Sequence, residues 1–176
     1  TELGFESKLF VDLDIQANQL DVHDLDNDGY ADVIVRDAGG KVTVYWGGPK
    51  GIDPSCSTEI VVPADDLVLS AEEQRREILH SEYNPDAPPL VRVVSLGDRP
   101  YVFVARHRSA HLVCVSQDRT IGDSITFTCS RAMAVAVGDI DGDGNEDIVV
   151  ACRESYGDSE SSWVYWGSDS GFNDSE

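Results

Sequence analysis

Basic residues are scarce in this chain of 176 residues, which has 13 Lys and Arg against 33 Asp and Glu and a formal net charge of −20. Proteins that bind nucleic acids need a basic surface that neutralises phosphates, so this composition argues against a nucleic-acid partner. Long apolar runs are also missing, and we therefore expect no membrane span. With 41% hydrophobic residues the chain still has the composition of a globular protein.

The common catalytic signatures are absent as well. The sequence contains no H-E-x-x-H zinc motif, no G-x-S-x-G nucleophile elbow, no P-loop and no G-x-G-x-x-G. These absences favour a non-catalytic function. The chain begins at Thr1 without a signal peptide or an initiator Met, so we expect a mature product or an excised piece of a longer protein.

Cysteine is limited to four residues, and none of them shows the C-x-x-C spacing of a zinc site. An even number is compatible with disulfides and an oxidising compartment. A cross-strand bridge between Cys114 and Cys129 is feasible if the chain reverses near residues 120–123. Small buried thiols that stay reduced are an equal alternative. The pairing is thus left open by the sequence for Cys56, Cys114, Cys129 and Cys152.

Two nine-residue stretches share the pattern D-x-D-x-D-G-x-x-D. One runs from Asp24 to Asp32 and the other from Asp139 to Asp147. Carboxylates that alternate with spacers converge on one side of a loop, and the glycine permits a sharp turn, which is how a chain surrounds a hard cation with oxygen atoms. We therefore expect two Ca²⁺ sites. The alternative is a pair of ordinary acidic turns, which Asp-Gly and Asn-Gly sequences also form.

The ligands expected in these loops differ from those of an EF-hand. An EF-hand needs a bidentate Glu at position 12, where these loops have Val35 and Val150. The ninth-position Asp must therefore close the cage, and the backbone carbonyl of the seventh residue faces the ion. The expected ligands are the side chains of Asp24, Asp26, Asp28 and Asp32 with the carbonyl of Tyr30, and the side chains of Asp139, Asp141, Asp143 and Asp147 with the carbonyl of Asn145.

The sequences that follow the two loops are also alike. Each loop leads into an apolar run that reads as a buried strand, and Val-Tyr-Trp-Gly follows at residues 44–47 and 164–167. This internal repeat resembles the FG-GAP or VCBS repeats of integrin α-chain-like β-propellers, whose blades carry a calcium loop of this kind between their first two strands. The resemblance implies an all-β fold of four-stranded antiparallel blades and calcium ligation by the ten residues named above.

A middle blade is expected between the two loops, because they start 115 residues apart and a propeller repeat has about 40–50 residues. Its strands are expected near residues 90–96, 101–105, 112–115 and 125–129. Only Gly97–Pro100 stands where its calcium loop would be, so this blade has lost the site.

The whole chain, residues 1–176, is thus interpreted as one β-propeller segment of about three blades. A capping box at Ser70–Glu73 predicts one short inserted helix near residues 71–80. Three blades cannot close a flat ring, so we expect either part of a larger propeller or a homo-oligomer. The expected parts are the outer strand of a neighbouring blade at 1–19, a calcium blade at 20–66, a helical insertion at 67–89, a degenerate blade at 90–130 and a second calcium blade at 131–176.

The resemblance implies a calcium-stabilised, non-catalytic extracellular module for binding or adhesion, secreted or on the cell surface or periplasmic, that recognises protein or carbohydrate. The alternative is the propeller portion of a carbohydrate-active enzyme such as a polysaccharide lyase, in which the basic stretch Arg106–His111 holds an anionic sugar. Trp46, Trp163 and Trp166 would stack on sugars if exposed and would otherwise fill the space between blades. The sequence does not choose the ligand, because a fold does not fix a function.

Overall fold

A computed structural model of the chain describes residues 16–63, 90–106, 109–129, 132–152 and 162–172. Within these ranges all regular structure is β-strand, and they contain no helix. The helix expected near residues 71–80 lies outside the described residues, as do residues 1–15 of the outer strand expected within residues 1–19. Residues 17–19 belong instead to β1, the first strand of the first sheet.

The first sheet is a four-stranded antiparallel meander in the order β1-β2-β3-β4. The first acidic loop joins β1 to β2, and His23 pairs with Asp32 where the loop closes. Valine and isoleucine follow Asp32 because β-branched side chains pack well on a buried pleated surface. The strands are β1 (Ala17–His23), β2 (Asp32–Asp37), β3 (Val42–Tyr45) and β4 (Ser57–Ile60).

The middle sheet repeats this order with β5 (Val91–Leu96), β6 (Arg99–Ala105), β7 (Ser109–Val115) and β8 (Ile121–Thr128). Only Gly97 and Asp98 connect β5 to β6, since Leu96 already pairs with Arg99. Gly97 has a φ of 57°, a left-handed conformation that glycine adopts without strain. A tight hairpin thus replaces the acidic loop in this sheet.

The third sheet has the order β11-β10-β9, formed by β9 (Ala132–Gly138), β10 (Asp147–Cys152) and β11 (Trp163–Tyr165). The second acidic loop joins β9 to β10, with Gly138 opposite Asp147. The predicted all-β fold is confirmed, because three successive antiparallel sheets of three or four strands are consistent with the blades of a propeller.

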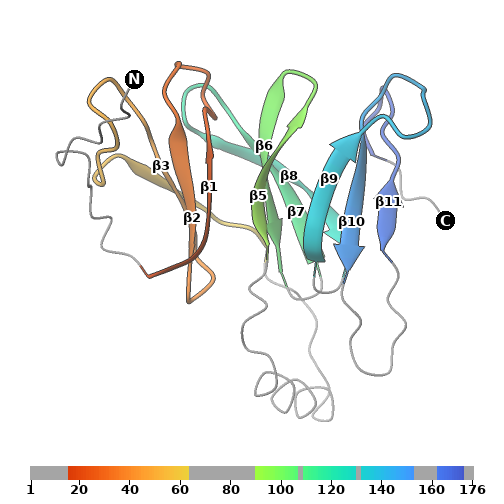
Figure 1. Cartoon of the computed structure of the whole chain (residues 1–176), viewed down its shortest axis with the longest axis horizontal. Coiled ribbons are helices and arrows are strands. Elements are labelled where there is room, and N and C mark those ends of the chain that lie inside the picture. Colours follow the sequence, from red (N-terminus) through yellow and green to blue (C-terminus); the bar gives the residue numbers. More distant parts are fainter. Residues whose placement is uncertain (1–15, 64–89, 107–108, 130–131, 153–161, 173–176) are drawn as a thin grey trace, which may run out of the picture.

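The middle sheet lies between its two neighbours (Figure 1), and its central strands β6 and β7 contribute to the cores on both sides. Successive side chains of a strand point to opposite faces. Val102 and Val104 of β6 accordingly join the core shared with the first sheet, whereas Phe103 and Ala105 join the core shared with the third. All four are at most 2% exposed.

Side chains of β1 also bond to the backbone of β5, the first strand of the next sheet. The Val91 N–H donates to Gln19 Oε1 at 2.7 Å, and the Val93 N–H donates to Asp21 Oδ2 at 2.8 Å. These bonds satisfy amides at the edge of the middle sheet. The turns β1–β2, β5–β6, β7–β8 and β9–β10 then lie at one end of the molecule (Figure 1).

The β7–β8 hairpin reverses earlier than the sequence suggested. The Ser116 N–H donates to the Thr120 carbonyl at 3.0 Å, and β8 begins at Ile121. Arg119 adopts a φ of 66° within this turn, and the Thr120 hydroxyl donates to Asp118 at 2.7 Å. The reversal expected near residues 120–123 was therefore misplaced, because a compact turn closes at Thr120 and residues 121–123 already belong to β8.

This register rules out a bridge between Cys114 and Cys129. Ser109 pairs with Thr128 and Val113 with Ser124, so the two cysteines lie at opposite ends of the hairpin. Cys129 lies about six residues beyond the position opposite Cys114, which is about 20 Å along the strands at about 3.3 Å per residue, whereas a disulfide joins Cα atoms about 4.4–6.8 Å apart.

The aromatic residues of the repeated Val-Tyr-Trp-Gly segments are mostly structural. Trp46 is 3% exposed, and its indole N–H donates to Thr58 Oγ1 at 2.9 Å. Tyr165 is buried, and its hydroxyl donates to the Thr128 carbonyl at 2.6 Å. Trp46 thus fills the space between sheets, while Trp163 is exposed on β11.

Candidate metal centre

The first loop gathers three carboxylates. One oxygen each from Asp24, Asp26 and Asp28 lies within 4.8 Å of the others. Calcium binds oxygen at about 2.3–2.6 Å, so two ligands of one ion are at most about 5 Å apart, and this donor set fits Ca²⁺. The loop holds itself in this shape, because the Gly29 N–H donates to Asp24 at 2.9 Å and the Tyr30 N–H donates to Asp28 at 2.8 Å.

The second loop gathers a slightly different trio, with oxygens of Asp139, Asp141 and Asp147 within 4.8 Å of one another. Asp139 accepts the N–H groups of Gly142 at 2.7 Å and Gly144 at 3.0 Å. Asp139 and Asp141 are exposed, whereas Asp147 is fully buried. The set again consists of hard oxygen donors at a spacing that suits Ca²⁺.

Asp143 is not one of this trio, although its carboxylate lies beside that of Asp141. Its carboxylate accepts the backbone N–H of Asn145 at 2.7 Å and the side-chain amide of Asn145 at 3.1 Å. These two bonds hold the pKa of Asp143 below its ordinary value. Asp143 therefore remains ionised and shapes the loop.

The ninth-position Asp makes the same two hydrogen bonds in both loops. Asp32 accepts the N–H of Leu25 at 2.8 Å and the N–H of Gly47 at 2.7 Å. Asp147 accepts the N–H of Ile140 at 2.7 Å and the N–H of Gly167 at 2.8 Å. This buried carboxylate thus ties the start of its loop to the chain that leaves the third strand.

Burial raises the pKa of the Asp32 carboxyl. The two backbone amides oppose that shift, and the negative charges of Asp26 and Asp24 reinforce it. A cation beside the loop would relieve this repulsion.

The glycine that follows each Trp is required by this arrangement. A Cβ on Gly47 would lie 2.3 Å from the carbonyl oxygen of Ala31, and a Cβ on Gly167 would lie 2.2 Å from that of Glu146. Both carbonyl oxygens belong to the backbone, so they cannot relieve the clash by a change of side-chain rotamer. The sequence shows the repeated Trp-Gly but not the reason for it, because the contacts join residues 16 positions apart (47 − 31) and 21 positions apart (167 − 146).

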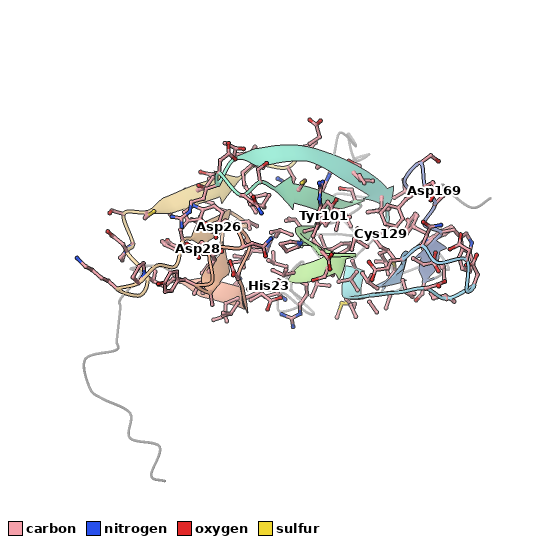
Figure 2. All side chains as sticks on the ribbon, turned by 90° about the horizontal axis from the view of Figure 1, so that it is seen from above. His23, Asp26, Asp28, Tyr101, Cys129 and Asp169 are labelled. Atoms are coloured by element: carbon pink, nitrogen blue, oxygen red, sulfur yellow. The ribbon has the colours of Figure 1, made fainter. Side chains whose placement is uncertain are left out.

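Arg119 distinguishes the first loop from the second. From the β7–β8 turn its Nε donates to Asp26 Oδ2 at 2.6 Å and its Nη2 donates to Asp28 Oδ2 at 3.0 Å. Figure 2 shows Asp26 and Asp28 together on the first sheet, at the end of the β7–β8 hairpin. Among the described residues, no Lys or Arg pairs with a carboxylate of the second loop. Arg119 could not be assigned to the loop from the sequence, since nothing local links this turn to the loop.

The ten predicted ligands are thus placed unequally. Six lie in the two close groups, and Asp32 and Asp143 accept amide hydrogens outside them. Tyr30 and Asn145 donate their own N–H groups to the loop carboxylates. Ligation by their carbonyls stays a prediction.

The described members of the basic stretch Arg106–His111 make contacts within the protein. His111 is 1% exposed, and its ring nitrogens lie 3.0 Å from Ser109 Oγ and 3.1 Å from Thr126 Oγ1. His111 lies within β7, where strand alternation turns its side chain into the protein. Arg106 Nη2 donates to the Val62 carbonyl at 3.1 Å. Residues 107–108 lie outside the described ranges.

Hollows adjoin both acidic loops on the side of the middle sheet. One, of about 540 Å³, lies between Leu25 and Asn27 of the first loop and Arg99 and Gln117 of the middle sheet. The other, of about 330 Å³, is lined by Gly97, Asn145 and Phe172 among others.

The described residues contain no helix long and apolar enough to cross a membrane.

Comparison with curated proteins gives no match. A family model described as the FG-GAP repeat matches residues 132–165, from the start of β9 to the end of β11. The matched segment contains the whole of the second acidic loop and the second Val-Tyr-Trp of the internal repeat. The resemblance inferred from the sequence is therefore confirmed, and this chain carries an FG-GAP repeat.

Proposed function

We propose that the chain is a calcium-stabilised, non-catalytic propeller module whose two acidic loops bind Ca²⁺. The observation that carries the proposal is the second loop, where oxygens of three carboxylates lie within 4.8 Å of one another. Like charges at this distance repel, and no basic side chain among the described residues pairs with them. A bound divalent cation would turn this repulsion into attraction.

The close groups name the residues that would hold the ions. Asp24, Asp26 and Asp28 would serve the first site, and Asp139, Asp141 and Asp147 the second. Tyr30, Asp32, Asp143 and Asn145 complete the proposed sets. The ions would neutralise the loops and fix the strand pairs β1–β2 and β9–β10, a structural role without a chemical step.

A binding or adhesion function outside the cell is the further part of the proposal. FG-GAP repeats form propeller modules that often bind other molecules, and this supports protein or carbohydrate as the partner class. The module would act within a larger propeller or as a homo-oligomer. No observation favours the polysaccharide lyase alternative, because Arg106 and His111 are engaged within the protein.

Titration calorimetry and thermal melting test the calcium sites. At 100 times Kd, Ca²⁺ adds about 2.7 kcal/mol per site to the free energy of unfolding, which is a shift in Tm of about 5–10 °C for a chain of this size. The Asp141→Ala variant should lose the heat of binding at the second loop. The matched control Asp98→Ala, in the two-residue β5–β6 turn, should bind like the parent.

Absence of any calcium heat at millimolar Ca²⁺, with equal melting in Ca²⁺ and EGTA, would reduce both loops to acidic turns. The binding role is tested separately by a screen of glycans and matrix proteins with and without EGTA. Binding that EGTA abolishes supports the module as proposed, and turnover of a polyuronate substrate would support the enzyme instead.

A further inference from the structure

The first acidic loop contains a cation supplied by the protein itself. We propose that Arg119 is a resident counter-ion that makes the first loop bind Ca²⁺ more weakly than the second and keeps it folded when Ca²⁺ is scarce. This inference rests on the proposed function, because it concerns the relative strength of the two calcium sites.

The guanidinium uses the oxygens that an ion would need. Arg119 takes Oδ2 of both Asp26 and Asp28, while the N–H groups of Asp28 and Tyr30 take the two Oδ1 atoms at 3.2 Å and 2.8 Å. All four oxygens of these two carboxylates therefore accept a hydrogen bond. In the second loop, Asp141 accepts one bond, from the Asp143 N–H at 3.1 Å, and its other oxygen has no donor among the described residues.

Several contacts hold the Arg119 side chain in this position. Its guanidinium carbon lies 5.2 Å from the centre of the Trp46 ring, a cation–π contact. Its Nη1 lies 3.5 Å from Cys56 Sγ, and its Nη2 lies 3.5 Å from the Gly47 carbonyl oxygen. The side chain therefore contacts Trp46, Gly47 and Cys56 as well as the loop carboxylates, and it is not a freely moving surface arginine.

Burial separates the two loops further. The Asp26 side chain is 2% exposed, whereas its counterpart Asp141 is exposed. A buried carboxylate needs a partner of opposite charge, and removing that partner is strongly destabilising. Arg119 satisfies this need without an ion, and the pKa of Arg119 is raised mainly by its bond to Asp26.

Ca²⁺ entering the first loop must then displace or approach the guanidinium. A divalent ion about 5 Å from a positive charge is repelled enough, even at the dielectric constant of water, to lower its affinity about tenfold. The second loop has no such competitor among the described residues. The two sites should consequently fill at different calcium concentrations.

The test removes Arg119 where only the first loop can bind. In an Asp141→Ala background, Arg119→Gln should lower the Kd for Ca²⁺ about tenfold in titration calorimetry. The control Lys41→Gln removes the same charge from an exposed pair with Glu59 on the first sheet and should change Kd less than twofold. In EGTA, Arg119→Gln should melt several degrees below the control, and Ca²⁺ should restore its Tm.

Two negative outcomes are distinguishable. If the parent chain binds Ca²⁺ but Arg119→Gln and Lys41→Gln have equal Kd in the Asp141→Ala background, the inference is overturned and the proposed function stands. No calcium heat in the parent or in either Arg119 variant overturns both. If Arg119→Gln does not fold, Arg119→Met decides, because it removes the same charge while an unbranched side chain still packs against Trp46. Its Kd should also fall about tenfold, and an unchanged Kd refutes the role.

Discussion

Replacement of Asp32 by Ala should destabilise the protein even without calcium. Its fully buried carboxylate accepts two backbone N–H groups, from Leu25 and Gly47. A buried donor left without an acceptor costs about 1–3 kcal/mol. Two such donors, partly offset by release of a carboxylate whose burial is unfavourable, give an expected loss of about 2–5 kcal/mol, against a typical total of about 5–15 kcal/mol.

Urea denaturation in EGTA measures this loss with no ion involved. The matched control is Asp24→Ala, whose oxygens accept the N–H groups of Asp28 and Gly29 at exposed positions. Water can replace those bonds, so the control should lose about 1 kcal/mol or less. The reasoning is refuted if Asp32→Ala changes the free energy of unfolding by less than about 1 kcal/mol in EGTA and by much more in Ca²⁺. Asp32 would then stabilise the protein as a calcium ligand and not through its backbone hydrogen bonds.

Two other predictions follow from backbone geometry. Gly47→Ala and Gly167→Ala should each lower the free energy of unfolding by about 1–3 kcal/mol, because the added Cβ would lie 2.3 Å and 2.2 Å from a carbonyl oxygen. The control Gly51→Ala introduces backbone strain without a collision, since Gly51 has a φ of 90° and its added Cβ would meet no atom within 4 Å. Equal losses of stability in all three variants would contradict the collision argument. Peptide mapping without reduction should find no Cys114–Cys129 crosslink, because the β7–β8 register separates them; recovery of that crosslinked peptide from the native protein would show that the register is wrong.

The elements that could be predicted are those whose signal is local. The apolar runs after Asp32 and Asp147 form β2 and β10, and the two-residue Gly97–Asp98 turn stands where a third acidic loop was expected to be missing. Alternation and glycine determine these features within a few residues.

The parts that could not be predicted depend on distant contacts. The bond from the Gly47 N–H to Asp32 crosses 15 positions, and that from Arg119 to Asp26 crosses 93. The position of the β7–β8 turn was misjudged because Arg119, which is not a glycine, adopts a left-handed conformation that the local sequence does not indicate. The same residue then proved to be the partner of the first loop.

The two-sided burial of the middle sheet bears on how the chain acquires its structure during synthesis. Translation delivers the first sheet before residues 91–128. Among the described residues, Ile34 and Val44 share their apolar core with side chains of β6 and β7, which emerge later. The middle sheet in turn waits for Ile148 and Val150 to cover Phe103 and Leu112. Each newly made sheet therefore exposes apolar side chains that pack against the sheet synthesised after it. If translation stalls within β8, the apolar side chains of the middle sheet that contact the third sheet stay exposed, and chaperones can bind them.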